Sequence, residues 1–156
     1  MFSSNEKQLA ILIDPGKYGV DCLVNLLQIM QQKPPHYILV GGSTTSSSMD
    51  ETINLIRQYL SVPVILFPGS ATQFTPKADA LMYLSLISGR NPDYLIGQHV
   101  LSSIPIKKSG LKVVPVGYML IESGRMTSVE YISNTKPIPS NKAEIAVCTA
   151  VAGELL

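Results

Sequence analysis

The first residue placed to do chemistry is an aspartate at the end of an apolar run. Residues 9–13 are continuously apolar and lead directly into Asp14, which Pro15 and Gly16 follow. A carboxylate at the end of a buried strand is costly unless it meets a cation or several hydrogen-bond donors, and Mg²⁺ with a phosphate is a common partner. The other interpretation, equally supported by the spacing, is that Asp14 caps the turn that Pro15-Gly16 begins.

A second candidate loop follows the next apolar run and combines glycines with hydroxyl groups. Gly41 and Gly42 precede Ser43, Thr44 and Thr45. Paired glycines let backbone N–H groups approach a phosphate, and the hydroxyls can bind that phosphate or a metal. The order of residues is not that of a Walker loop. A serine-rich loop leading to a helix cap would explain residues 46–48 well, but it explains the paired glycines poorly.

Histidine, cysteine and aromatic residues give weaker indications. His99 falls inside a predicted helix, where a structural role is slightly favoured, although a later helix start would place it in a loop at the mouth of a pocket. Cys22 and Cys148 are predicted to be reduced core residues on apolar helix faces. No spacing supports a Ser/His/Asp triad or a zinc site. Six large side chains are most simply core, although a channel for an apolar substrate would need residues of the same kind: Phe67, Met82, Tyr83, Tyr94, Tyr118 and Met119.

Strands and helices are predicted to alternate along the chain. The first helix carries apolar residues at three- and four-residue spacing, and Ser48 with Glu51 has the spacing of a capping box. Asn91 and Asn141 are predicted caps and Gly110 a helix stop, whereas Pro115 suggests that its strand starts late or bulges. The predicted strands are 9–13, covered on both faces, 37–40, 62–67, 80–87 and 113–121; the predicted helices are 21–31, 49–60, 92–107 and 143–156, with a polar connection over 122–141.

This alternation predicts an α/β fold with parallel strands. An open doubly wound sheet and a closed barrel both fit, because each collects ligands at the carboxyl ends of its strands. The 156 residues suit a single domain over 1–156, and 46% hydrophobic with 15% charged residues excludes disorder. A net charge of +1 with scattered Lys and Arg argues against nucleic-acid binding. The absence of a signal pattern and of a membrane-spanning run predicts a cytoplasmic protein that meets lipid in a pocket or at a membrane surface.

Several motifs taken together resemble one family closely. Over nearly the whole chain, their order and spacing are similar to those of the archaeal-type branch of the geranylgeranylglyceryl phosphate synthases. The motifs are Leu12-Ile13-Asp14-Pro15-Gly16-Lys17, Val40-Gly41-Gly42-Ser43-Thr44, Phe67-Pro68-Gly69, Ala78-Asp79-Ala80, 91–99 (NPDYLIGQH), Gly117-Tyr118 and 133–139 (SNTKPIP).

The resemblance implies a TIM (β/α)8 barrel and a Mg²⁺-dependent prenyltransferase. Such an enzyme moves a geranylgeranyl or similar polyprenyl group from its diphosphate to the primary hydroxyl of sn-glycerol-1-phosphate, and it is expected to be a homo-oligomer that allows peripheral membrane contact. By position, Asp14 and Ser43 are the expected Mg²⁺ ligands. The expected substrate-binding residues are Gly41, Gly42, Thr44, His99 and Tyr118.

The chain also departs from the family pattern. Leu12 stands where the bacterial heptaprenyl branch has a lysine, so that contact with glycerol phosphate cannot be transferred. The family continues with a strand bearing Tyr-Leu-Glu and with glycine-rich phosphate loops, so the glutamate expected as catalytic base lies beyond Leu156. We therefore expect about the first five β/α units of an incomplete barrel, which keep the metal end of the site and lack turnover. The alternatives are another phosphate-binding barrel of the sugar-phosphate isomerase type, or a non-catalytic oligomerising remnant.

Overall fold

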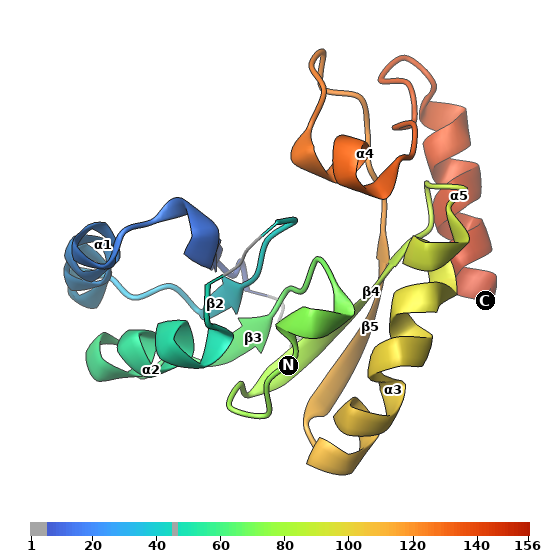
Figure 1. Ribbon diagram of the computed structural model, residues 1–156. Helices are drawn as coiled ribbons and strands as arrows, with labels where there is room; N and C mark the ends of the chain where they lie inside the picture. Colours follow the sequence, from blue (N-terminus) through green and yellow to red (C-terminus); the bar gives the residue numbers. More distant parts are fainter. Residues whose placement is uncertain (1–5, 45–46) are drawn as a thin grey trace.

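The protein is a curved parallel sheet with helices packed along it. A computed structural model describes residues 6–44 and 47–156. Five strands pair in the order β1-β2-β3-β4-β5, every pair parallel, which confirms the predicted alternation (Figure 1). Their bounds are β1 Ala10–Ile13, β2 Tyr37–Val40, β3 Val64–Leu66, β4 Ala80–Leu86 and β5 Lys112–Tyr118.

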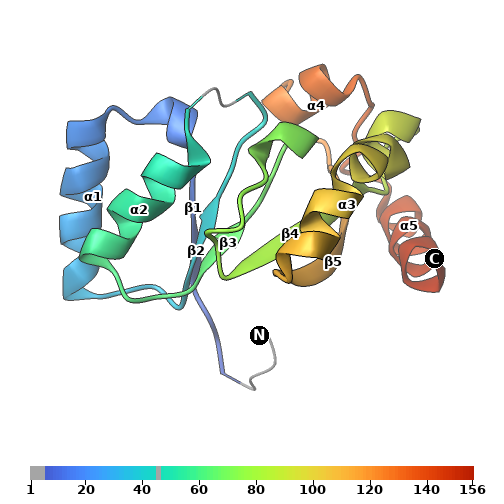
Figure 2. The same ribbon diagram turned by 60° about the horizontal axis from the view of Figure 1, so that its bottom comes forward.

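Helices connect the strands and lie beside the part of the sheet that they join. Figures 1 and 2 show α1 and α2 near β1–β3, α3 and α5 near β4 and β5, and α4 set at one end of β5. The helices are α1 Val20–Gln32, α2 Met49–Tyr59, α3 Gln98–Ser109, α4 Ser128–Ser133 and α5 Ala143–Leu155; shorter turns are η1 Pro15–Lys17, η2 Ala71–Gln73 and a π-helical η3 Asp93–Gly97.

The core lies between the central strands and the first two helices. Leu27 of α1 and Ile53 of α2 are fully buried, and they belong to one apolar cluster with Val40 and Leu66. A second, smaller apolar cluster contains Ile65, and the partly buried Met82 packs against it. The helix periodicity predicted the α1 and α2 faces correctly because one apolar stripe on each must be removed from water.

The first strand is less buried than predicted. In β1 only Ile13 is buried, and Leu12 is 46% exposed. β1 pairs with β2 alone and forms an edge of the described sheet. An apolar run therefore predicted the strand correctly but its burial on both faces wrongly, since burial depends on neighbours that periodicity does not reveal.

The prediction for Pro115 is also corrected. β5 begins at Lys112 and carries Pro115 in its interior, where it pairs in regular register with Tyr83. The strand neither starts late nor bulges there. It pairs only with β4 among the described residues, and an edge strand tolerates proline because one side of its backbone needs no ladder donor.

The predicted burial of the two cysteines is wrong, although both are free thiols as predicted, and one cap prediction is wrong. Cys22 and Cys148 are both exposed. Cys22 lies beside the buried face of α1 rather than on it, and the apolar residues of α5 are spread around the helix, so their pattern could not indicate a buried face. The cap of α5 is Lys142 rather than Asn141. Gly110 does end α3, with a left-handed φ of 69°.

The predicted polar connection contains a helix that periodicity did not reveal. α4 spans only six residues, and its signal is a cap: Thr127 Oγ1 accepts a hydrogen bond from Glu130 N–H at 3.2 Å. An isolated parallel bridge between Ile121 and Ile138 joins the two ends of the segment that contains α4. α4 is thus held as an ordered element at the end of β5. Among the described residues, no helix has the length and apolar character needed to cross a membrane.

Candidate active site

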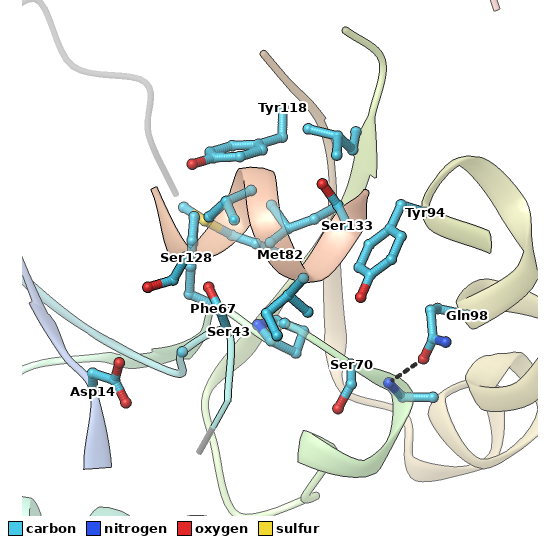
Figure 3. Close-up of a pocket in the computed structure, with 18 of the residues that line it drawn as sticks. Asp14, Ser43, Phe67, Ser70, Met82, Tyr94, Gln98, Tyr118, Ser128 and Ser133 are labelled. Carbon is cyan, nitrogen blue, oxygen red and sulfur yellow. Dashed lines mark hydrogen bonds between the residues drawn. The ribbon is translucent and has the colours of Figure 1, made fainter. Parts of the chain in front are cut away.

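A cavity of about 590 Å³ lies at the carboxyl ends of the strands and extends along β4. Its lining is divided chemically. Asp14, Lys17 and Ser43 lie after β1 and β2, whereas aromatic and aliphatic side chains predominate on β4, β5 and η3 (Figure 3). The segments after β3 and around α4 contribute both kinds, such as Phe67 with Ser70 and Ile132 with Arg125. The division suits a ligand with a charged head and an apolar body.

Asp14 lies at the polar end of the cavity. Its Oδ1 accepts a hydrogen bond from Gly16 N–H at 3.2 Å, and its Oδ2 lies 3.5 Å from Lys17 Nζ. The carboxylate therefore caps the η1 turn, as one interpretation predicted, and also lines the cavity, as the other required. A carboxylate has about four lone-pair sites, so these two contacts leave room for a further cation.

The glycine loop after β2 packs directly against Asp14. A Cβ atom on Gly42 would lie 2.4 Å from the Asp14 carboxyl group. Gly41 has a φ of 155°, and a Cβ atom there would lie 1.9 Å from the backbone oxygen of Phe67. The close approach of the loops after β1, β2 and β3 explains the paired glycines, and it brings Ser43 and Asp14 to the same cavity.

Gln73 joins two of these loops, and sequence reasoning missed it. The side chain is only 5% exposed. Its Oε1 accepts from Gly69 N–H at 3.0 Å and from Gly42 N–H at 3.4 Å, and its Nε2 donates to Gly42 O at 2.7 Å. No local sequence pattern announces these bonds, because the partner residues Gly42 and Gln73 are 31 positions apart.

His99 lies on the α3 wall of the cavity and is buried. Its Nε2 lies 3.3 Å from Ser85 Oγ, its ring makes an edge contact with Tyr83, and the Tyr83 hydroxyl donates to His99 O. His99 Nδ1 is buried and has no hydrogen-bond partner among the described residues. The residue therefore combines the structural role that was favoured with a place in the cavity lining.

Five of the six large side chains singled out in the sequence line the cavity, and Tyr83 and Met82 also pack against the core. Phe67 and Tyr118 meet edge to face, with ring centroids 6.1 Å apart, and both line the cavity with Met82, Tyr83 and Tyr94. Figure 3 shows Tyr118 and Tyr94 on different sides of the space above Ser43 and Ser70. These five side chains line the cavity, whereas Met119, the sixth, does not.

α4 supplies the part of the wall that sequence reasoning did not expect. Val129 and Ile132 line the cavity, and Ser133 lines it at the end of the helix. Asn91 Nδ2 donates to Ser133 O at 2.7 Å, which ties α4 to the segment before η3. The long connection after β5 is therefore part of the candidate site.

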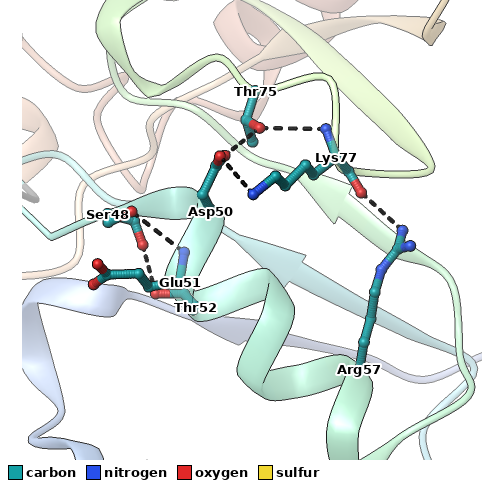
Figure 4. A network of polar contacts seen from close by, with 7 residues as sticks. All are labelled: Ser48, Asp50, Glu51, Thr52, Arg57, Thr75 and Lys77. Atoms are coloured by element: carbon teal, nitrogen blue, oxygen red, sulfur yellow. Dashed lines mark hydrogen bonds and ion pairs between the residues drawn. The ribbon is translucent and has the colours of Figure 1, made fainter.

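A polar network attaches the segment that follows η2 to α2 (Figure 4). The Thr75 hydroxyl donates to Asp50 Oδ1, and Lys77 Nζ lies 2.9 Å from Asp50 Oδ2. Arg57 donates to Lys77 O at 2.8 Å. The Thr75 hydrogen bond, followed by Lys77, holds the pKa of Asp50 below its ordinary value. The network attaches the η2 segment to α2, whose own first turn is capped by Ser48, as predicted.

Asp50→Asn is expected to lower the free energy of unfolding at pH 7 by about 0.2–1 kcal/mol, the range of exposed ion pairs. The lowered pKa means that the carboxylate contributes stability above the ordinary aspartate pKa, and that this contribution disappears as pH falls through the acid range. Urea unfolding at pH 7 and about pH 3 should therefore show the difference between wild type and variant shrinking at low pH.

Asp21→Asn is the matched control, because Asp21 occupies the first turn of α1 as Asp50 occupies that of α2. An equal loss in the two variants would assign the effect to the helix position and would contradict the Thr75–Lys77 contribution.

The structure brings most of the predicted site residues together. Asp14, Gly42, Ser43, His99 and Tyr118 line one cavity. Gly41 is buried behind this lining, and Thr44 is exposed and outside it. Thr45 and Ser46 lie outside the described residues. Within residues 6–44 and 47–156, no three His, Cys, Asp or Glu side chains are grouped to hold a metal by themselves.

This geometry defines a parallel β/α protein with a cavity at the carboxyl ends of its strands. The family model described as the PcrB family matches residues 3–156, and the chain belongs to this family. It is 50% identical over 154 residues to a geranylgeranylglyceryl phosphate synthase of Spirosoma linguale, covering 98% of this chain and 62% of that protein. It is 38% identical to a geranylgeranylglyceryl phosphate synthase of Methanothermobacter thermautotrophicus, covering 93% of this chain and 59% of that protein.

Solved structures agree on the fold. The wild-type enzyme from Thermoplasma volcanium matches with a TM-score of 0.84 at 27% identity, over 94% of this chain and 59% of that one. The (S)-3-O-geranylgeranylglyceryl phosphate synthase of Thermoplasma acidophilum, in complex with sn-glycerol-1-phosphate, matches with a TM-score of 0.87 at 30% identity. The match covers 97% of this chain and 61% of that one. The predicted fold, about five β/α units of a (β/α)8 barrel, is confirmed. The chain spans about three-fifths of the length of the proteins it matches.

Proposed function

We propose that this chain forms the metal and diphosphate end of a prenyltransferase site. The enzyme would move a geranylgeranyl or similar polyprenyl group to the primary hydroxyl of sn-glycerol-1-phosphate. The observation that carries the proposal is the division of one cavity into a polar end, with Asp14, Lys17 and Ser43, and an apolar wall. The relatives named above, at 50% and 38% identity, support the choice of reaction.

The donor set at the polar end fits Mg²⁺. Asp14 and Ser43 offer hard oxygen atoms, and Gly42 lets their loops approach without a side chain between them. Mg²⁺ usually takes one or two protein oxygens and completes its shell with water and substrate phosphates, so a site without a third acidic ligand suits it. Bound there, Mg²⁺ would neutralise charge on the diphosphate and help it leave.

The residues of the chain itself would bind the substrate and exclude water. Lys17 adds a positive charge beside Asp14 for the diphosphate. As the allylic C1–O bond breaks, positive charge develops on carbon, the acceptor hydroxyl attacks there and loses its proton, and diphosphate departs. Phe67, Met82 and Tyr118 would surround the prenyl tail and keep water from the carbocation-like carbon. The catalytic base is not assigned to a residue of this chain.

Geranylgeranyl diphosphate is expected to bind the chain in Mg²⁺ and to be released by EDTA. Burial of even four methylene-sized groups of the tail adds about 3 kcal/mol, so it should bind more than about 100-fold more tightly than inorganic pyrophosphate. Isothermal titration with both ligands, with and without EDTA, measures these differences.

The same titration separates the alternatives. Preferential, metal-independent binding of ribose 5-phosphate would favour the sugar-phosphate isomerase type. Failure of every ligand to bind, together with self-association, would favour the oligomerising remnant. Self-association and membrane-surface contact stay predictions from the family resemblance, and a cytoplasmic location stays a prediction from the sequence.

A further inference from the structure

We infer that Gln73 is a positioning residue that fixes the glycine loops carrying the metal- and diphosphate-binding groups. This inference rests on the proposed function of the cavity and adds to it a residue that touches neither substrate nor metal. Gln73 ends η2 and is buried, and its three hydrogen bonds all go to backbone groups of the loops after β2 and β3.

The amide can satisfy these partners in one orientation only. Its carbonyl oxygen accepts from the N–H groups of Gly42 and Gly69, and its NH₂ group donates to Gly42 O. Turning the amide over would place donor against donor and acceptor against acceptor. Because the group is buried, water cannot replace a lost bond at no cost. The position of Gly42 is thus determined from both its N–H and its carbonyl oxygen.

The loops that Gln73 joins pack, backbone against backbone, beside the proposed metal ligands Asp14 and Ser43. A Cβ atom on Gly69 would lie 2.4 Å from Gly42 O, and one on Gly42 would lie 2.4 Å from the Asp14 carboxyl oxygen. The three loops are therefore stacked without side chains between them. Ser43 follows Gly42 directly, so a shift of Gly42 moves the Ser43 hydroxyl relative to Asp14.

The residues on both sides of Gln73 are held by contacts with helices. On one side, Gln98 Oε1 of α3 accepts from Ala71 N–H at 2.9 Å. On the other, the Thr75–Asp50–Lys77 network attaches the following residues to α2 (Figure 4). η2 thus connects α2 and α3 to the loops at the polar end of the cavity.

The test compares Gln73→Met with wild type in amide hydrogen exchange and in metal binding. Methionine keeps the length of glutamine and makes none of the three hydrogen bonds. Exchange at Gly42 and Gly69 N–H should accelerate about tenfold or more, and Mn²⁺ affinity in the presence of pyrophosphate should fall about tenfold, as measured by electron paramagnetic resonance. A purely structural role would leave the Mn²⁺ affinity of the folded variant unchanged.

Gln31→Met is the matched control. Gln31 is exposed near the end of α1, its Nε2 donates to Tyr59 O at 3.0 Å, and neither residue lines the cavity. It should leave Mn²⁺ affinity and the exchange of Gly42 and Gly69 as in wild type. If Gln73→Met does not fold, Gln73→Asn, which keeps a buried amide of shorter reach, replaces it.

Wild-type protein supplies an independent measurement. Mn²⁺ with pyrophosphate should slow exchange at Gly42 and Gly69 more than at core strand amides, because ligand binding and loop order are linked. No slowing there, or equal Mn²⁺ affinity in folded Gln73 variants and wild type, overturns the inference and leaves the proposed function standing. Wild type that binds neither Mn²⁺ nor pyrophosphate instead overturns the proposed function.

Discussion

Asp14→Asn is expected to weaken Mg²⁺-dependent pyrophosphate binding by at least about 100-fold, because it removes the only carboxylate that lines the cavity among the described residues. Loss of an outer-shell partner already costs about 10–100-fold in metal affinity, and loss of a charged ligand should exceed that. Asparagine keeps the oxygen that accepts from Gly16 N–H, so the η1 turn and the fold should survive. Isothermal titration with pyrophosphate at fixed Mg²⁺ measures the change.

Asp21→Asn controls for loss of one negative charge near the N-terminal end of the chain, since Asp21 is exposed in the first turn of α1. It should bind pyrophosphate as wild type does. Unchanged binding in the Asp14 variant would reduce that residue to a turn cap, which was the competing interpretation of the sequence.

Gly41→Ala is expected to cost the largest loss of stability, at least about 3 kcal/mol. The new methyl group would lie 1.9 Å from the backbone oxygen of Phe67, and a φ of 155° is rarely adopted by residues with a side chain. Neither strain can be relieved by turning a side chain, because the obstacle is backbone. The midpoint of urea unfolding should fall accordingly.

Gly19→Ala is the matched control for this substitution. Gly19 has an ordinary φ of −67°, and a Cβ atom there would meet nothing within 4 Å. Its change should stay within about 1 kcal/mol, since alanine is only a poorer helix cap than glycine. Similar losses at positions 19 and 41 would show that the close approach of the loops after β2 and β3 does not limit stability.

The local elements could be predicted because each depends on its own residues. The apolar stripe of α2 and the Ser48 cap are both visible in the sequence, and both are present in the structure. The α4 helix was missed because it is too short for periodicity, although the Thr127–Glu130 cap could have revealed it. Burial failed where it depended on neighbours: Leu12, Cys22 and Cys148 are apolar by type and exposed by position.

The sequence by itself determined the order of strands and helices and the motifs at the strand ends, because turn chemistry and periodicity are local. Only the tertiary structure decided that Asp14 and Ser43 line one cavity, that Phe67 and Tyr118 form its wall, and that Gln73 joins the glycine loops. These relations connect residues about 30 or more positions apart. Residues so far apart in the sequence come together because the strands pair in parallel, which brings the ends of successive strands to one edge of the sheet.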